Sequence, residues 1–150
     1  MVGRKLVKTV SFPARSKPHM LRVSPDGKEV WVQTADANTN VVLGADDLSV
    51  LSTEPTGKSP VTNAWTPDRR YAIVTNGKDT FAQVFDATTH QEVKRLIIGP
   101  GGTNIGFSKD GNTAFIAVTG ANRVAVVDMR KLALESLIRA GKEPQGLIVR

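Results

Sequence analysis

The sequence contains no cysteine, few aromatic residues and no long hydrophobic run. Because Cys is 0 in 150 residues, a disulfide scaffold, a cysteine-based zinc site and a thiol nucleophile are excluded. Phe, Trp and Tyr make up only 5% of the chain, and no segment reaches the roughly 18 consecutive apolar residues of a membrane-spanning helix. The first residues are basic but lack the apolar core of a secretory signal peptide. We therefore expect no membrane span and no signal peptide in this sequence.

Acidic residues are fewer than basic ones, 14 against 20, which gives a net charge of +6. A basic excess favours contact with polyanions, but the basic residues are scattered as pairs such as Arg69-Arg70 and Lys94-Arg95. We expect a solvated surface and no nucleic-acid partner, with polyanion binding through the basic surface kept as an alternative. The 13 Gly, 8 Pro and 40% hydrophobic residues are typical of many short strands joined by tight turns around a core.

A motif recurs every 42 residues. Ser-Pro-Asp-Gly at 24–27 returns as Thr-Pro-Asp-Arg at 66–69 and as Ser-Lys-Asp-Gly at 108–111. Gly57, Gly99 and Gly141 keep the same spacing. In such a turn Asp bonds the backbone and the final Gly accepts a positive φ. The repeat therefore predicts three equivalent hairpin turns, with Arg69 in the left-handed conformation that its Gly counterparts favour.

Each repeat has the pattern of four strands. We expect first strands at 19–23, 61–65 and 103–107, second strands at 30–34, 72–76 and 114–118, third strands at 41–43, 83–85 and 124–127, and fourth strands at 50–54, 92–98 and 134–139. The second and third strands are apolar at successive positions, which is typical of a sheet covered on both faces. The fourth strands are charged, as an exposed edge should be. A four-stranded antiparallel unit of about 42 residues, covered on both faces, is a propeller blade.

Parts of the chain resemble the YVTN-type β-propeller repeat. They are residues 18–27 (PHMLRVSPDG), 73–76 (IVTN) and 122–128 (NRVAVVD), while 142–146 (KEPQG) is similar to the start of another copy. The resemblance implies a bacterial propeller that commonly has seven blades, in the periplasm or secreted. Similar blades occur in surface proteins, lactonase-like enzymes, haem-binding reductase propellers and polyanion binders, so the resemblance does not fix a function.

We predict an all-β fold, a partial β-propeller of about three and a half blades. The blades are 16–57, 58–99 and 100–141; residues 1–15 form the outermost strand of a closing blade, and 142–150 the first strand of a truncated next blade. Three blades cannot close a ring, and an open stack leaves apolar sheet faces uncovered. We therefore expect the remaining blades of a larger parent propeller to cover them, or self-association through the open blade faces.

Candidate ligand-binding residues lie where the first strands begin, because propellers bind ligands on the axial face where these entrances meet the second-to-third-strand loops. They are Lys17, His19, Lys58, Asn63, Thr103, Asn104, Lys142 and Gln145. The three lysines occupy nearly equivalent repeat positions and could hold an anion. His19 stands alone, without the partners that a metal site needs, so we expect no metal and no cofactor. We interpret His90 as a solvated turn residue and Gly99–Gly102 as an inter-blade connection, because a phosphate loop needs a following helix.

The sequence leaves three functions open. The first is a non-enzymatic binding or scaffold propeller that presents its axial loops to a protein or a small anionic partner. The second is part of a propeller enzyme, either lactonase-like or a haem- or quinone-linked oxidoreductase domain, whose catalytic groups lie mostly in other blades. The third is polyanion binding through the basic surface. No complete catalytic set can be assembled from the residues present.

Overall fold

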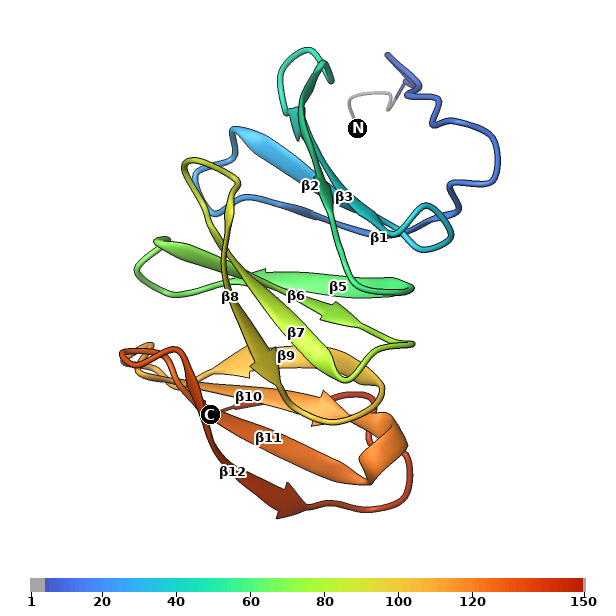
Figure 1. Ribbon diagram of the computed structural model, residues 1–150. Coiled ribbons are helices and arrows are strands. Elements are labelled where there is room, and N and C mark those ends of the chain that lie inside the picture. Colours follow the sequence, from blue (N-terminus) through green and yellow to red (C-terminus); the bar gives the residue numbers. More distant parts are fainter. Residues whose placement is uncertain (1–4, 150) are drawn as a thin grey trace.

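The computed structural model describes residues 5–149, which form twelve strands and one short 3-10 turn in three separate sheets (Figure 1). The strands of the first sheet are β1 (Pro18–Val23), β2 (Glu29–Thr34), β3 (Thr39–Gly44) and β4 (Val50–Pro55). Those of the second are β5 (Pro60–Trp65), β6 (Tyr71–Asn76), β7 (Phe81–Asp86) and β8 (Glu92–Ile97). Those of the third are β9 (Gly102–Phe107), β10 (Thr113–Val118), β11 (Arg123–Asp128) and β12 (Ala133–Arg139), with the turn η1 (Thr119–Ala121) between β10 and β11. The predicted all-β fold is confirmed.

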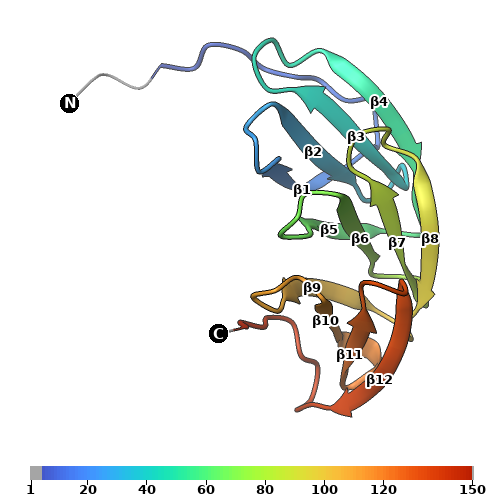
Figure 2. The same ribbon diagram turned by 90° about the vertical axis from the view of Figure 1, so that its left-hand side faces the viewer.

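Each sheet is one propeller blade, because its four strands pair antiparallel in sequence order. We call the sheets the first, second and third blade. Figure 2 shows them side by side in a fan, with β1, β5 and β9 on the inner side and β4, β8 and β12 on the outer side. The innermost strands of neighbouring blades contact one another. The chain is therefore a partial β-propeller of three complete blades, and each sheet lies within one predicted 42-residue unit.

The backbone has residues with positive φ at equivalent turn positions of the repeats. The first-to-second-strand hairpins contain Gly27 (φ 76°), Arg69 (φ 63°) and Gly111 (φ 73°). The third-to-fourth-strand turns contain Leu48 (φ 56°), His90 (φ 61°) and Leu132 (φ 48°). The entrances to β1, β5 and β9 contain Lys17, Ser59 and Gly101, with φ of 51°, 54° and 78°, and Glu143 has a φ of 50° at the equivalent repeat position. The predicted left-handed conformation of Arg69 is confirmed.

An aspartate fixes each hairpin turn. The Asp26 carboxylate accepts hydrogen bonds from the Ser24 hydroxyl at 2.6 Å and from the Lys28 N–H at 3.1 Å. Asp68 and Asp110 accept equivalent bonds in the second and third blades. Because the Ser108 hydroxyl and the Asn112 N–H stabilise its ionised form, the pKa of Asp110 falls from 3.8 to about 2. The turn therefore depends on an ionised carboxylate.

The two joints between blades differ in composition. The joint between the second and third blades is a large apolar cluster that includes Ile73, Ile105 and Ile116. The joint between the first and second blades has a smaller cluster: Trp31, Val42, Ala72, Val74 and Phe85, with Trp65 at its edge. Trp31 is fully buried and Trp65 half-buried, so both rings pack in this joint.

The terminal segments lie against the two ends of the stack, on the open sheet faces of the first and third blades. Val10 and Phe12 pack on the first-blade cluster of Val32, Val41 and Leu43. At the other end, the side chains of Leu147 and Val149 lie over Gly106 of β9, where a Cβ would meet them at 2.6 and 2.9 Å. The open faces are therefore covered in part by residues 10–12 and 147–149.

Neither terminal segment pairs with another strand among residues 5–149. The expectations that 1–15 and 142–150 are strands of adjoining blades therefore stay predictions, and their parts at 1–4 and 150 lie outside the described residues. Gly99–Gly102 connects β8 to β9, as expected. Across the described chain, no helical segment has the length and apolar character needed to traverse a bilayer.

Candidate functional site

The predicted axial residues come from the entrances to the innermost strands, on the right-hand side of Figure 1, where the β2–β3 and β6–β7 loops also lie. We call this side the entrance face. Five of the candidates are exposed: Lys17, His19, Lys58, Lys142 and Gln145. The ammonium of Lys17 lies 4.0 Å from the Asp36 carboxylate, a loose ion pair in solvent. The entrance face therefore carries exposed lysines at the entrances to the first and second blades and at Lys142, whereas the entrance to the third blade has none.

The other candidates are engaged within the blades. Thr103 and Asn104 are half-buried; the Asn104 side-chain oxygen accepts from the N–H of Ile105 at 2.8 Å. The Thr103 hydroxyl lies 3.5 Å from the carbonyl oxygen of Gln145, and the His19 ring nitrogen Nδ1 lies 3.2 Å from the carbonyl oxygen of Val61. These two contacts join equivalent positions one repeat apart. His19 therefore connects β1 to β5, and Thr103 connects β9 to the segment that contains Gln145.

Asn63 is fully buried, and neither atom of its amide has a hydrogen-bond partner in the protein. It lies opposite Val74 in the β5–β6 register and therefore faces the joint with the first blade. Four further amide side chains are fully buried at or beside this joint: Gln33, Asn40, Asn76 and Gln83. Gln33 donates to Asn40 at 2.8 Å, and Gln83 accepts from the N–H of Gly57 at 2.8 Å. The joint thus combines a small apolar cluster with a row of amides.

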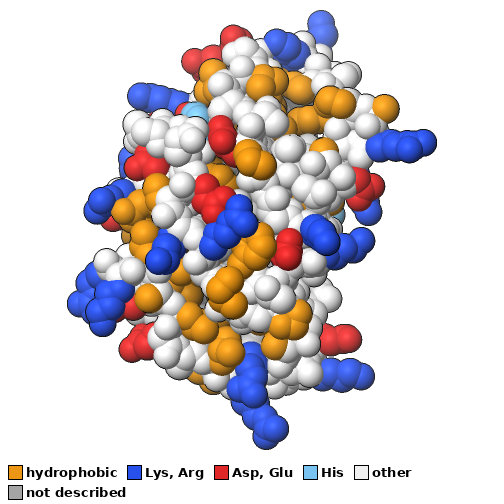
Figure 3. All heavy atoms as spheres, viewed as in Figure 1, with side chains coloured by type: hydrophobic (Ala, Val, Ile, Leu, Met, Phe, Trp, Pro, Cys, Tyr) orange, Lys and Arg blue, Asp and Glu red, His pale blue; other side chains and the backbone are white. Residues whose placement is uncertain are grey.

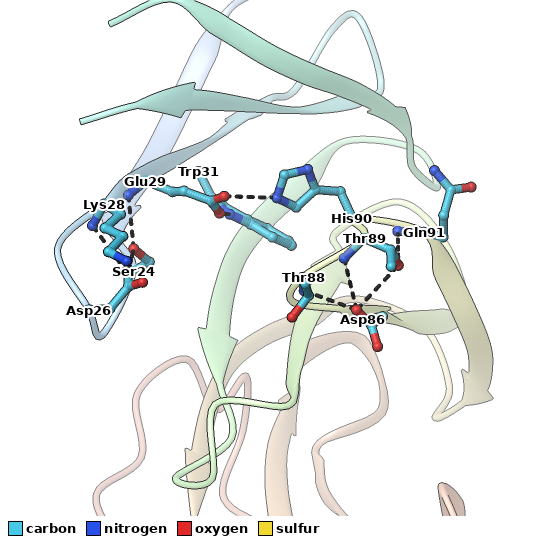
Figure 4. Close-up of polar contacts among 10 residues, drawn as sticks. All are labelled: Ser24, Asp26, Lys28, Glu29, Trp31, Asp86, Thr88, Thr89, His90 and Gln91. Carbon is cyan, nitrogen blue, oxygen red and sulfur yellow. Dashed lines mark hydrogen bonds and ion pairs between the residues drawn. The ribbon is translucent and has the colours of Figure 1, made fainter. Parts of the chain in front are cut away.

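Glu29 and His90 close one end of this joint, on the face that carries the hairpin turns (Figure 4). We call it the hairpin face. The Glu29 carboxylate accepts from the Trp31 indole N–H at 2.9 Å, and its other oxygen lies 3.0 Å from His90 Nε2. The His90 ring stands edge-on to Trp31, with centroids 5.6 Å apart and an interplanar angle of 84°. The His90 side chain is only 12% exposed.

The interpretation of His90 as a solvated turn residue was therefore wrong. Its positive φ turns the side chain back from the β7–β8 turn onto the first blade, where Glu29 receives it. The repeat held a signal: the positions of Glu29 and His90 are occupied in the following joint by Tyr71 and Leu132, which pack beside the apolar cluster. A carboxylate that orients an imidazole in this way can bind a polar group or hold a proton.

A cleft of about 340 Å³ opens beside Glu29, between the first and second blades. Its walls come from the first hairpin, the second hairpin and the β7–β8 turn: Ser24, Pro25, Asp26, Glu29, Trp65, Arg69, Ala87 and Thr88. A second hollow of about 470 Å³ lies toward the inner strands and shares Pro25 and Trp65 with the first. The two hollows therefore adjoin at Trp65, which lines both. The cleft lies on the hairpin face, whereas the predicted ligand-binding residues come from the strand entrances on the opposite, entrance face.

Comparison with known proteins identifies the fold but not a family. No protein-family model and no curated protein matches the chain. Among solved structures, hydrazine synthase from Kuenenia stuttgartiensis matches 93% of this chain and 40% of its own, at 23% identity and a TM-score of 0.80. The periplasmic gluconolactonase of Pseudomonas aeruginosa matches 91% and 43%, at 18% identity and a TM-score of 0.76.

The WD40 repeats of RRP9 match 88% of this chain and 41% of theirs, at 11% identity and a TM-score of 0.79. The chain thus spans less than half the length of each of these three proteins. Structural similarity at such low sequence identity shows only that the fold is shared, and one fold can serve unrelated activities. The chain therefore has the fold of a β-propeller segment of three blades.

Proposed function

We propose that the chain is a non-enzymatic binding module whose entrance face holds an anionic group, either of a small molecule or of an acidic protein segment. The observation that carries this proposal is the exposure of Lys17, Lys58 and Lys142 at nearly equivalent repeat positions on one face, although the entrance to the third blade at 100–102 has no lysine. The chain's net charge of +6 adds a favourable long-range field for an anionic partner.

The entrance loops are held by side-chain hydrogen bonds, which supports a preorganised surface. The Ser59 N–H donates to the Asn38 side-chain oxygen at 2.8 Å, and two repeat units further the Glu143 N–H donates to the Asn122 side-chain oxygen at 2.8 Å. Both asparagines have positive φ. The Lys58 N–H donates to Asp79 at 2.8 Å. Fixed loops lower the ordering cost of binding.

We also propose that the chain acts as part of a larger propeller. The contact of Glu143 with Asn122 repeats that of Ser59 with Asn38, and the contact of Gln145 with Thr103 repeats that of Val61 with His19. Residues 142–149 thus sit on the third blade much as the start of the second blade sits on the first. This supports their assignment as the first strand of a further blade.

A titration with inorganic phosphate and with a poly-glutamate peptide, followed by NMR, tests the binding proposal. Amides of the entrance loops should shift, and Lys58→Gln should weaken binding, whereas Lys94→Gln on the outer strand β8 should not. Retention on heparin at low salt that is lost at moderate salt would support the third function, polyanion binding through the basic surface. Counterion release makes such binding salt-dependent. Equal binding by the Lys58→Gln variant and the parent chain would refute the entrance-face site.

One observation favours a second candidate, part of a propeller enzyme. Glu29, which lines the cleft, contacts His90 at 3.0 Å, and carboxylate-oriented imidazoles serve as general bases. One structural neighbour carries the name gluconolactonase. Hydrolysis of gluconolactone by the parent chain, lost in the His90→Leu variant, would support this candidate; equal rates with and without the chain would exclude it for that substrate.

A further inference from the structure

Arg69 occupies a backbone conformation in which the other two repeats use glycine. Its φ is 63°, against 76° at Gly27 and 73° at Gly111. A residue with a Cβ is strained in this region, so an arginine here lowers stability relative to glycine. Strained positions that persist in a fold point to a functional use of the side chain. The rest of the hairpin keeps its repeat geometry, including the Asp68 bonds to Thr66 and to the Arg70 N–H.

The geometry of the repeat places the Arg69 side chain against the preceding blade. At the equivalent Gly111, a Cβ would meet Pro67 of the second blade at 3.2 Å. Pro67 corresponds to Pro25 of the first blade, and Arg69 and Pro25 both line the cleft beside Glu29. Arg69 therefore extends over the cleft between the first and second blades, on the hairpin face.

The two acidic residues of this cleft are already engaged. Both oxygens of Glu29 are occupied, one by the Trp31 indole N–H and one by His90, and one Asp26 oxygen serves the turn. Within residues 5–149, Arg69 makes no ion pair and no side-chain hydrogen bond. Its guanidinium, with donors arranged for two-point contact to a carboxylate or phosphate, is therefore available to a ligand.

The equivalent cleft between the second and third blades differs at these points. Glycine replaces the arginine, and the cations that line it are in contact with other groups: Arg130 and Lys131 lie 3.4 and 3.5 Å from Asp128, and Arg70 lies 4.9 Å from the Tyr71 ring centroid. The free guanidinium is thus a property of one cleft and not of the repeat in general.

We propose that the cleft lined by Arg69 and Trp65 binds a small organic anion, a carboxylate or a phosphate monoester, that carries an apolar ring or chain. Arg69 binds the charged group, and the half-buried Trp65 offers the apolar part a surface that continues into the hollow with Ala64, Ile105 and Phe107. The site lies on the face opposite the three lysines and does not depend on them.

NMR titration of the whole chain with phenyl phosphate, benzoate and uncharged benzyl alcohol tests this site. We expect the Trp65 indole and the amides of residues 24, 26–29, 69 and 87–88 to shift with at least one of the two anions, and that anion identifies the ligand class. Benzyl alcohol and the Arg69→Asn variant should each bind about tenfold more weakly or worse, the loss expected for a charge-assisted hydrogen bond. Asparagine tolerates the positive φ, so this variant keeps the turn.

The Lys94→Gln variant is the matched control, because it removes one exposed positive charge from the outer strand β8. It should bind the anion as tightly as the parent chain. The proposal is overturned if Arg69→Asn and the parent chain bind equally, if the shifts fall on the entrance loops instead, or if neither anion produces shifts at roughly 10 mM, a concentration tenfold above a Kd of 1 mM. Shifts confined to the entrance loops would instead support the lysine site.

Discussion

Replacing Arg69 with glycine should stabilise the fold. The residue has a φ of 63°, and the left-handed conformation costs a residue with a Cβ about 1–2 kcal/mol relative to glycine. Glycine in turn gains conformational freedom in the unfolded chain, which offsets about 0.5–1 kcal/mol of this. Since Arg69 is exposed and has no ion pair within residues 5–149, little else is lost. We therefore expect the free energy of unfolding to rise by about 0.5–1 kcal/mol.

Urea unfolding at constant pH measures this difference, with two reverse substitutions as controls. Gly27→Ala should lower the free energy of unfolding by about 1 kcal/mol, because its φ is 76°. No clash adds to this cost, since nothing lies within 4 Å of the added Cβ. Gly111→Ala should cost more, because its Cβ also meets Pro67 at 3.2 Å. An unchanged or lower stability of Arg69→Gly, with both alanine variants destabilised, would refute the strain at Arg69. A gain in stability together with lost anion binding would link the strain to function.

Three further results are expected. Ile116→Ala should lower the free energy of unfolding by about 2–5 kcal/mol because Ile116 is fully buried between the second and third blades, whereas Ile97→Ala, 63% exposed, should change it by about 0.5 kcal/mol or less in chemical unfolding. Asp110 has a folded-state pKa of about 2 against 3.8, so its contribution is present above pH 3.8 and lost as pH falls through 2; Asp110→Asn should therefore be less stable at neutral pH, with the gap closing in acid, and a constant gap would contradict this. Phe12→Asp should increase self-association in light scattering because Phe12 helps to cover the outer face of the first blade, and an unchanged molecular mass would contradict that role.

The fold followed from the sequence because one local signal occurs three times. The Ser-Pro-Asp-Gly type of turn fixes a hairpin, its 42-residue spacing fixes the unit, and strands apolar on both faces, such as 72–76, require covering blades. Even the conformation of Arg69 could be predicted, since its repeat partners are glycines. Local chemistry repeated in register therefore determined the architecture.

The candidate site could not be predicted in the same way. The contact between Glu29 and His90 joins residues 61 positions apart, and it depends on how one blade packs on the next. His90 lies in a turn among polar neighbours, which locally indicates a solvated residue. The available signal was a departure from the repeat. Glu29 and His90 occupy the positions that hold Tyr71 and Leu132 one repeat later. Asn63 was singled out, but its complete burial follows from the blade joint and not from its neighbours in sequence.

Native-state hydrogen exchange tests the central claim, that each 42-residue repeat folds as one four-stranded blade covered by its neighbours. Amides of the middle strands β6, β7, β10 and β11 should be the most protected, since these strands are paired on both sides and largely buried. Protection should recur with the repeat and fall at the hairpin turns. Rapid exchange throughout residues 72–76 and 114–118, or helical chemical shifts there, would contradict the account.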